Sequence, residues 1–269
     1  MGISVCMTET KPLAVVTGAS SGIGFELAKV FAANGFDVLI NAENGRLDAA
    51  AEHLRSAGAH VEPVQADLGT YDGVEQLYAA IVSTGRPVSA AALNAGVGQG
   101  GAFIDTDLAD ELKIIDLNVT STVHLAKRLL RHMVTQSDGK LLITSSIAST
   151  MPGSFQAVYN ASKSFLQSFA QALQNELKDT NVTITSLMPG PTDTDFFHRA
   201  DMEDTKVGQA QKDDPAQVAQ QGFEALMNGE RKIIAGSAKT KVQGIASKVL
   251  PDSIKGAAHR QMVKPGSGE

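Results

Sequence analysis

Several features are scarce in this sequence, and each absence narrows the class of protein. One cysteine in 269 residues cannot form an internal disulfide, so nothing indicates an oxidising compartment. That residue, Cys6, lies in a polar stretch, and we interpret it as an incidental thiol. No apolar run approaches the roughly 20 residues that span a bilayer. Residues 1–12 lack a basic region followed by an apolar one, so we expect no secretory signal, no membrane partner and a cytoplasmic location.

An excess of positive charge is also missing. The chain has 23 Lys and Arg against 29 Asp and Glu, a formal net charge of −6. This balance gives no electrostatic reason to expect nucleic acid or an anionic membrane as a partner. The histidines show no metal-ligand spacing, so we predict no metal site and expect most of them at the surface. The six are His53, His60, His124, His132, His198 and His259.

Short apolar runs alternate with longer amphipathic ones along most of the chain. The runs predict strands at 13–17, 37–41, 60–66, 89–94, 140–145, 182–188 and 231–236. The amphipathic stretches predict helices at 22–34, 46–57, 72–84, 108–134, 158–178 and 215–228. Such alternation is typical of βαβ units. We therefore predict an α/β fold, a Rossmann-like doubly wound parallel sheet of about seven strands with helices on both faces, in a single domain over residues 12–236.

Three segments lie outside this rhythm. Residues 1–11 are expected to be flexible. Residues 190–214 are long, polar and poorly periodic, which is usual for a functional lid or a disordered segment, and we interpret them as a substrate lid. The tail, residues 237–269, is rich in lysine and predicts a short helix with a solvated basic face; an interaction tail is the weaker alternative.

A glycine-rich turn follows the first predicted strand. It reads TGASSGIG from Thr17 to Gly24 and precedes an amphipathic helix. Glycine permits a tight turn and close approach of backbone to a ligand, and the free N–H groups of the helix suit a pyrophosphate. The loop has no G-K-[ST] ending, so it is not a nucleoside triphosphate loop of the Walker type.

Tyr159 and Lys163 stand four residues apart in the run AVYNASKSF. That spacing puts both side chains on one face of a helix. A free tyrosine has a pKa of about 10, too high for acid–base work near neutrality, and a neighbouring ammonium lowers it. The pair could serve as a proton relay. Taken alone, an exposed pair on an ordinary helix would be the better interpretation.

The motifs together resemble those of the short-chain dehydrogenase/reductase family. They run in family order over about residues 12–236: TGASSGIG (17–24), ADL (66–68), NAG (94–96), LNV with Asn118, SSIAS (145–149), YNASK (159–163) and MPGPTDT (188–194). The resemblance implies a Rossmann-like fold and hydride transfer between a nicotinamide cofactor and a carbonyl or alcohol.

The resemblance also implies roles for individual residues. Tyr159 would be the general acid/base, Lys163 would lower its pKa and bind the nicotinamide ribose, Ser146 would orient the substrate oxygen, and Asn118 would position a water. Ser145 is the weaker candidate for the serine. The expected cofactor residues are Gly18, Ser20, Ser21, Gly22, Ile23, Gly24, Glu43, Asp67, Leu68, Asn94, Ala95, Gly96, Tyr159, Lys163, Pro189, Gly190, Thr192 and Thr194.

The end of the second predicted strand bears on the choice between NAD(H) and NADP(H). Ala42 and Glu43 stand where NAD-preferring members often have Asp and NADP-preferring members often have Arg. A carboxylate there would accept hydrogen bonds from a ribose and repel a 2′-phosphate. Ser21 replaces the basic residue common in NADP binders, while Arg46 complicates the comparison. Together these residues weakly favour NAD(H) over NADP(H) as the cofactor.

We expect the substrate pocket between the 147–157 loop, the end of the strand at Met188 and the 190–214 segment. Its expected residues are Ser146, Met151, Phe155, Gln156, Met188, Phe196 and Phe197. They are mostly apolar, which favours a small-molecule substrate with an apolar carbonyl or secondary alcohol. An equally good interpretation is that Phe196 and Phe197 have a structural role alone and pack the lid against the core.

Two other functions share these features. A dinucleotide-binding sensor or scaffold would keep the fold without turnover, but the intact set of Tyr159, Lys163, Ser146 and Asn118 argues against it. A lyase or epimerase would use the cofactor transiently, and this chain is short for one. By resemblance, the chain would form a homodimer or homotetramer through the helices at 108–134 and 158–178.

Overall fold

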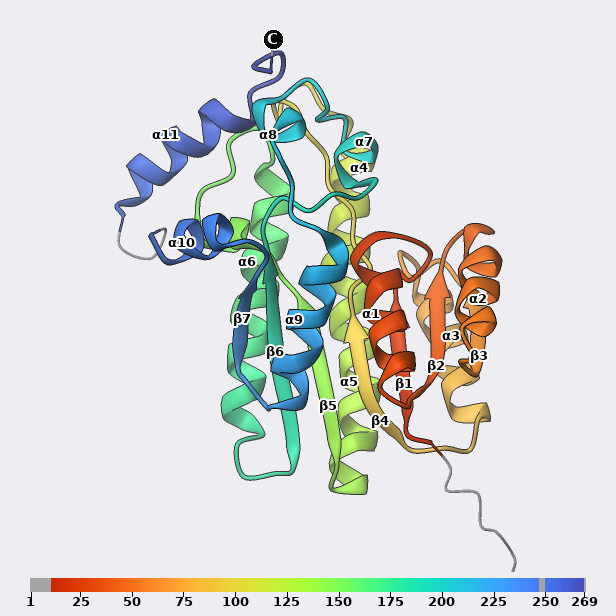
Figure 1. Cartoon of the computed structure of the whole chain (residues 1–269). Helices are drawn as coiled ribbons and strands as arrows, with labels where there is room; N and C mark the ends of the chain where they lie inside the picture. Colours follow the sequence, from red (N-terminus) through yellow and green to blue (C-terminus); the bar gives the residue numbers. More distant parts are fainter. Residues whose placement is uncertain (1–10, 247–249, 269) are drawn as a thin grey trace, which may run out of the picture.

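The chain folds around one parallel sheet, seen in the computed structural model in Figure 1. The structure describes residues 11–246 and 250–268, so the expected flexibility of the N-terminal segment and the surroundings of Cys6 concern residues outside it. The strands are β1 Leu13–Thr17, β2 Asp37–Ala42, β3 Val61–Gln65, β4 Val88–Leu93, β5 Gly139–Thr144, β6 Val182–Pro189 and β7 Lys232–Ala235. All seven predicted strands are confirmed, within one residue at either end.

The strand order is β3-β2-β1-β4-β5-β6-β7, and each neighbouring pair is parallel. The chain leaves β1 for β2 and β3 on one side and returns at β4 on the other. The order of strands therefore reverses between β1 and β4. In doubly wound sheets, ligands bind at the carboxyl ends of the strands at such a point.

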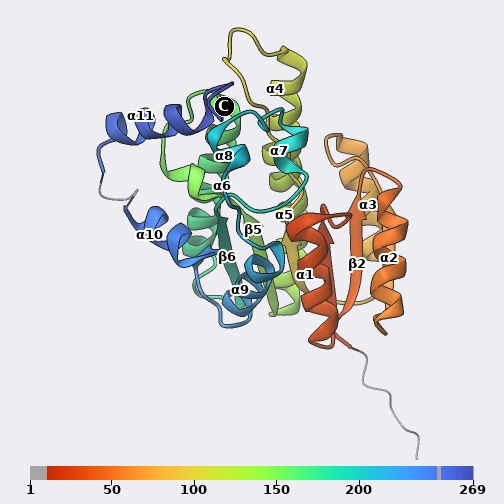
Figure 2. The same ribbon diagram turned by 45° about the horizontal axis from the view of Figure 1, so that its top comes forward.

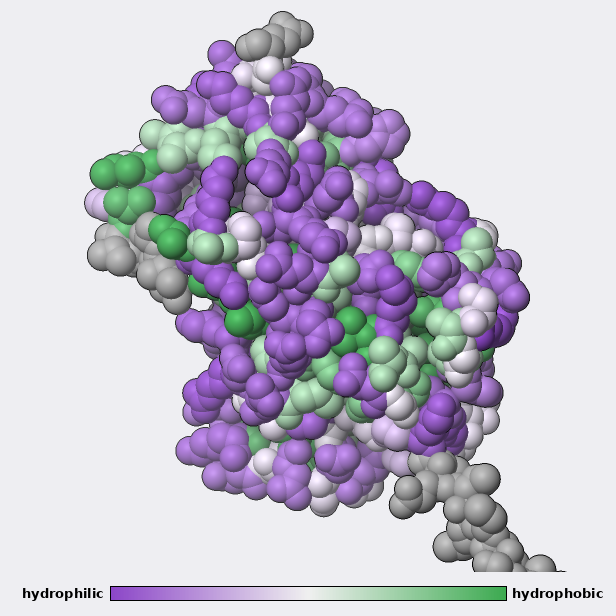
Figure 3. Space-filling model, viewed as in Figure 1, coloured by the Kyte–Doolittle hydropathy of each residue, from purple (hydrophilic) through white to green (hydrophobic). Residues whose placement is uncertain are grey.

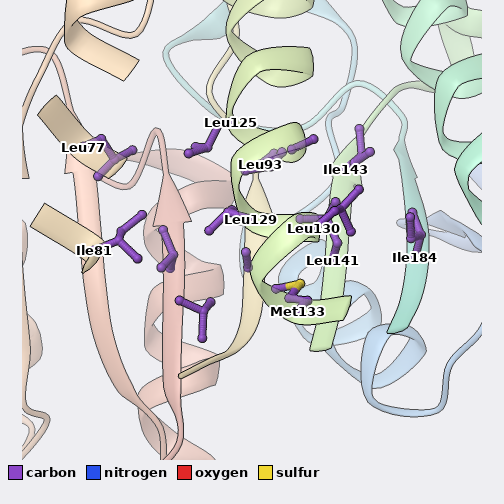
Figure 4. Packing of buried hydrophobic residues seen from close by; sticks show 14 of the residues in the cluster. Leu77, Ile81, Leu93, Leu125, Leu129, Leu130, Met133, Leu141, Ile143 and Ile184 are labelled. Carbon is purple, nitrogen blue, oxygen red and sulfur yellow. The ribbon is translucent and has the colours of Figure 1, made fainter. Parts of the chain in front are cut away.

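Helices cover both faces of the sheet. They are α1 Gly22–Ala33, α2 Arg46–Ser56, α3 Tyr71–Ser83, α4 Leu108–Ile114, α5 Ser121–Gln136, α6 Ala157–Glu176, α7 Phe196–Arg199, α8 Lys206–Gln209, α9 Pro215–Met227, α10 Ala238–Ala246 and α11 Asp252–Val263. Apolar residues of α3, α5 and α6 pack on one face, part of which Figure 4 shows, and those of α1, α2 and α9 pack on the other.

The strands bury both of their faces, which explains their almost continuous apolar sequence. Along β1, Leu13 and Val15 face the cluster under α3 and α5, whereas Ala14 and Val16 face the cluster under α1 and α9. Side chains of a strand alternate between faces, so a two-sided core needs apolar residues at every position. The fold prediction is confirmed.

The predicted helix at 108–134 is not regular. Residues Ile115–Thr120 form a π-helical turn between α4 and α5. A π turn accommodates one extra residue and often occurs at a functional site. Here it lies where Asn118, which is fully buried, bonds to Val97 and Ser162. Tertiary contacts of this amide accompany the change in helix geometry, and the apolar pattern of the segment does not reveal them.

The short helices gather above the carboxyl ends of the strands, at the top of Figure 1 and facing the reader in Figure 2. The irregular 190–214 segment contains α7 and α8, of four residues each. The tail is helical, but it contains two helices, α10 and α11, where the sequence predicted one. Hydrophilic residues cover most of the face seen in Figure 3. Within the described residues, every helix is too short or too polar to cross a membrane.

Candidate active site

A continuous cavity of about 370 Å³ runs along the carboxyl ends of the strands. It collects most of the residues singled out from the sequence. Those that line it are Gly18, Ser20, Ser21, Gly22, Ile23, Glu43, Asp67, Leu68, Asn94, Ala95, Gly96, Ser146, Met151, Gln156, Tyr159, Lys163, Pro189, Gly190, Thr192, Thr194, Phe196 and Phe197. Four others do not line it: Gly24, Asn118, Phe155 and Met188.

The glycine loop forms one end of the cavity. Gly18 and Gly22 have φ values of 66° and 56°, which favour glycine. A Cβ at Gly24 would lie 2.2 Å from the carbonyl oxygen of Gly18, so glycine there permits the close packing of α1 against the loop. Among the described residues, the Ser21 side chain makes no capping bond to α1. The first N–H groups of α1 thus remain available to an anionic group such as a pyrophosphate.

Asn94 ties together the ends of three strands behind this loop. Its backbone N–H and that of Ala95 donate to the Thr17 hydroxyl at 3.0 and 3.1 Å. Its side-chain oxygen accepts from the Thr144 hydroxyl at 3.2 Å. The turn 94–96 therefore holds the gap between β1 and β4 in a fixed shape.

The opposite wall carries Ser146, Tyr159 and Lys163. Ser146 is close enough to the Tyr159 hydroxyl to influence its pKa, and the Ser146 hydroxyl also accepts from the Ala148 N–H at 3.1 Å. The Lys163 ammonium lies 5.8 Å from the centroid of the Tyr159 ring and donates to the Thr144 carbonyl at 3.0 Å. Ser145, by contrast, donates to the Lys163 carbonyl at 2.9 Å and so holds α6 against β5. Ser146, and not Ser145, faces the tyrosine.

Burial dominates the ionisation of this pair. It raises the pKa of the Tyr159 hydroxyl to about 12, and the neighbouring Ser146 side chain offsets part of that rise. Burial also lowers the pKa of the Lys163 ammonium to about 8. The sequence led us to expect a lowered tyrosine pKa. In the chain by itself the direction is opposite, because removal from water disfavours the charged phenolate.

Asn118 lies behind the cavity wall rather than on it. Its side-chain oxygen accepts from the Val97 N–H, and its amide group donates to the Val97 carbonyl and the Ser162 hydroxyl, all within 2.9–3.0 Å. Its side-chain oxygen and the Lys163 ammonium also lie 3.1 and 3.4 Å from the position of a Cβ at Gly96. Asn118 thus fixes the backbone at 96–97 beside Lys163.

The far end of the cavity, near the glycine loop, carries carboxylates. Glu43 and Asp67 both line it, and Asp67 accepts from the Gly69 N–H at 2.9 Å. Arg46 does not stand free beside them. Its guanidinium donates to Asp195 of the 190–214 segment at 2.6 Å, an exposed ion pair that joins the start of α2 to this segment.

Phe196 and Gln156 reach the cavity near Tyr159. Gln156 is buried and donates to the Met202 sulfur at 3.0 Å. Two expected pocket residues point elsewhere. Met188 is buried in β6, and Phe155, which has a φ of 63°, lies under the Arg260 guanidinium at 5.0 Å from its ring centroid.

The sequence interpretation missed one wall of the cavity. Lys255, Ala258, His259, Met262 and Val263 of α11 all line it. The expectation of a solvated basic helix is therefore wrong for this face, and His259 is buried, whereas most histidines were expected at the surface. The spacing of these five residues is helical, but lysine and histidine among them hid the pattern.

Known proteins match this fold and site. A family model described as short chain dehydrogenase matches residues 12–205. An uncharacterised oxidoreductase of Bacillus subtilis, YmfI, is 30% identical over 189 residues, which cover 69% of this chain and 77% of that protein. A 3-oxoacyl-[acyl-carrier-protein] reductase of Synechocystis is 30% identical over 196 residues, 72% of this chain and 79% of that protein.

A solved structure gives the same picture. A short-chain dehydrogenase from Sphingobium yanoikuyae, in complex with NADPH, superimposes with a TM-score of 0.76 at 26% identity, covering 89% of this chain and 96% of that one. The glycine cradle, the uncapped start of α1 and the Tyr159–Ser146 pair fit the cofactor of this family. The chain therefore belongs to the short-chain dehydrogenase family, and it is an oxidoreductase that works with a nicotinamide dinucleotide.

Proposed function

We propose that the chain transfers a hydride between a nicotinamide cofactor and an apolar ketone or secondary alcohol, with Tyr159 as general acid/base. One observation carries the proposal. The Tyr159 hydroxyl and its neighbour Ser146 line the same cavity that the glycine loop closes at its other end.

A bound dinucleotide supplies or accepts the hydride. In the direction of reduction, Tyr159 gives its proton to the carbonyl oxygen while the Ser146 hydroxyl holds that oxygen. The Lys163 ammonium stabilises the phenolate that remains, because opposite charges attract more strongly out of water. Asn118 is a positioning residue that keeps Gly96 and Val97 in place.

The remaining cofactor residues divide by position. The glycine loop, Ser20, Ser21 and Ile23 hold the pyrophosphate. Asp67 and Leu68 contact the adenine, and Asn94 to Gly96 line the middle of the cleft. Pro189, Gly190, Thr192 and Thr194 contact the nicotinamide. Residues 190–214 are the substrate lid.

NAD(H) is the preferred cofactor. Glu43 lines the cavity next to Asn44 and presents its carboxylate where a 2′-phosphate would bring negative charge. Arg46, the cation that could have offset this, is already paired with Asp195. The reaction takes place in the cytoplasm.

The protein works as a homodimer or homotetramer. Large apolar side chains are exposed on and before α4 and on α6. They include Ile104 at 89%, Leu108 at 65% and Phe165 at 43% exposure. Apolar patches of this kind are buried in many oligomers. Light scattering of the parent and of Phe165→Asp tests this, because a monomeric parent would exclude it.

The function is tested with a panel of ketones, aldehydes and secondary alcohols, read as NADH or NADPH absorbance. Tyr159→Phe is expected to lose about 10²-fold or more in kcat, as for removal of a general acid. Its Kd for NADH should stay close to that of the parent. Tyr71→Phe is the matched control, because Tyr71 is 67% exposed on α3.

Two outcomes would overturn the proposal. Undiminished turnover by Tyr159→Phe would remove the assignment of the acid. A parent that binds NADH tightly and turns over nothing in the panel would favour the sensor or scaffold, and product formation without net cofactor change would favour a lyase or epimerase.

A further inference from the structure

Helix α11 presents one continuous face to the active-site cavity. The residues on this face are Lys255, Ala258, His259, Met262 and Val263. They are spaced i, i+3, i+4, i+7 and i+8, the stripe that a helix buries against one surface. Ile254, at the edge of this face, is 51% exposed and does not line the cavity. The helix lies beyond residue 205, where the match to the family model ends.

The charged end of this face is already paired. The Lys255 ammonium donates to the Thr150 carbonyl at 2.9 Å and forms an ion pair with Asp252 at 2.7 Å. His259 lies against Asn160, with 3.4 Å between its ring nitrogen Nε2 and the Asn160 amide nitrogen, and burial lowers its pKa. These contacts fasten α11 to the 147–157 loop and to α6, and they leave its face close to neutral.

The other end of the face is apolar and joins the lid. Val263 and Met262 belong to a cluster with Phe197, Ala200, Met202 and Val207, against which Phe196 also packs. Phe196 in turn contacts the ring of Tyr159, at 5.1 Å between ring centroids. An unbroken apolar surface therefore runs from the reacting phenol to the end of α11.

The chain after α11 is bonded to the lid as well. The Gly266 N–H donates to the Asp204 carboxylate at 2.5 Å, and the Gly268 N–H donates to the Asp204 carbonyl at 2.9 Å. The Lys206 N–H donates to the Ser267 hydroxyl at 3.1 Å. Helix α11 and the lid thus cover the cavity together, at the top of Figure 1 and turned towards the reader in Figure 2.

We propose that α11 is a specificity-determining wall of the substrate pocket, and that Met262 and Val263 contact the part of the substrate farthest from its carbonyl. The substrate is a neutral apolar ketone or secondary alcohol whose hydrocarbon part runs from Tyr159 to α11. This inference rests on the proposed function for the reaction and adds the element that limits substrate length. Arg199, which also lines the cavity, is an exposed residue of α7 and does not add charge to the α11 face.

The test compares kcat/KM for linear methyl ketones from butanone to 2-dodecanone in three full-length variants. Met262→Ala should raise kcat/KM for the longest ketones about tenfold relative to butanone, because a pocket discriminates roughly this much per methylene. Met262→Trp should shift the optimum to shorter ketones. Ile254→Ala, at an exposed α11 residue outside the cavity lining, should keep the parent profile. The inference is overturned if both Met262 variants also keep it.

The charge of the substrate provides a second test. The parent should use 2-decanone at least tenfold better than 9-oxodecanoate, because the α11 face offers no unpaired cation to a carboxylate. The reverse preference would overturn the assignment of a neutral substrate.

Fluorescence tests the wall independently of turnover. The chain has no tryptophan, so Met262→Trp and Ile254→Trp each contain a single tryptophan whose fluorescence can be followed. Addition of 2-decanone should shift the emission of Met262→Trp and leave that of Ile254→Trp unchanged. Equal behaviour of the two variants would overturn the inference. A selective shift without turnover of any ketone would instead refute the proposed reaction and leave the wall in place.

Discussion

The ring of Phe196 lies 5.1 Å from the ring of Tyr159, with their planes inclined by 50°. The same phenylalanine ring comes within 2.5 Å of where a Cβ at Gly98 would stand. Glycine at 98 therefore lets Phe196 of the 190–214 segment reach the phenol that we propose as the acid. Phe196 also lines the cavity beside Tyr159.

Phe196→Ala should weaken the binding of apolar substrates. Loss of the ring removes contact area worth about 1.5–3 kcal/mol when fully buried, so we expect KM for apolar ketones to rise roughly tenfold while kcat falls less. Phe103→Ala, at a residue 58% exposed, is the control. Steady-state kinetics with two ketones of different length provide the measurement. An identical substrate profile would mean that Phe196 has a packing role and does not contact the substrate.

The sequence predicted the sheet and most of the cleft for a physical reason. Short apolar runs bounded by turn residues predict strands directly, and in a parallel sheet their carboxyl ends meet on one edge. Residues just after the strands, such as Gly18, Asn94 and Ser146, must then lie close together. Tyr159 and Lys163 share a helix face by spacing alone.

Features that depend on tertiary contacts could not be predicted in this way. The π turn at Asn118 goes with bonds to Val97 and Ser162, which are distant in sequence from it or lie on another helix. The face of α11 packs on the irregular 190–214 segment, which has no periodicity of its own. The raised pKa of Tyr159 comes from burial, which a pair of residues on a helix does not reveal.

Glu43→Arg should shift the cofactor preference towards NADP(H). The substitution replaces a carboxylate that lines the cavity with a cation that can pair with a 2′-phosphate. We expect the ratio of kcat/KM for NADPH over NADH to rise about tenfold or more. Glu62→Arg on β3, a carboxylate outside the cavity lining, is the matched control. No change in the ratio would mean that Glu43 does not contact the ribose.

Lys163→Met should change how stability depends on pH. The pKa of Lys163 is depressed in the folded chain, from 10.5 to about 8. Burial of the charged ammonium costs free energy of folding. The folded chain is therefore most stable above the unfolded pKa of 10.5, and this stability is lost as the pH falls through about 8. Relative to the variant, the parent should gain about 2 kcal/mol in free energy of unfolding between pH 7 and pH 10.

Urea denaturation of both proteins at several pH values measures this gain. The variant leaves the Thr144 carbonyl without its Lys163 donor at every pH, so the slope with pH, and not the absolute difference, carries the prediction. Lys140→Met is a suitable control, because Lys140 also donates to a backbone carbonyl, that of Met227, but lies outside the cavity lining. Parallel curves for parent and Lys163→Met would show that the ammonium is not withdrawn from water.

Gly24→Ala should damage the cofactor end of the cleft although alanine is the best helix former. An added Cβ would lie 2.2 Å from the Gly18 carbonyl oxygen and 2.6 Å from the Asn94 amide nitrogen, and neither the backbone nor a bonded asparagine can move without opening the glycine loop. Overpacking of this kind costs about 1–3 kcal/mol, which should lower Tm by several degrees. Gly45→Ala is the control, because a Cβ there meets nothing within 4 Å.

Calorimetry and NADH titration should separate the two variants. Gly24→Ala should have a lower Tm and a Kd for NADH raised by about tenfold or more, whereas Gly45→Ala should behave like the parent. If Gly24→Ala binds NADH as tightly as Gly45→Ala, the loop does not hold the pyrophosphate in the way that its geometry indicates.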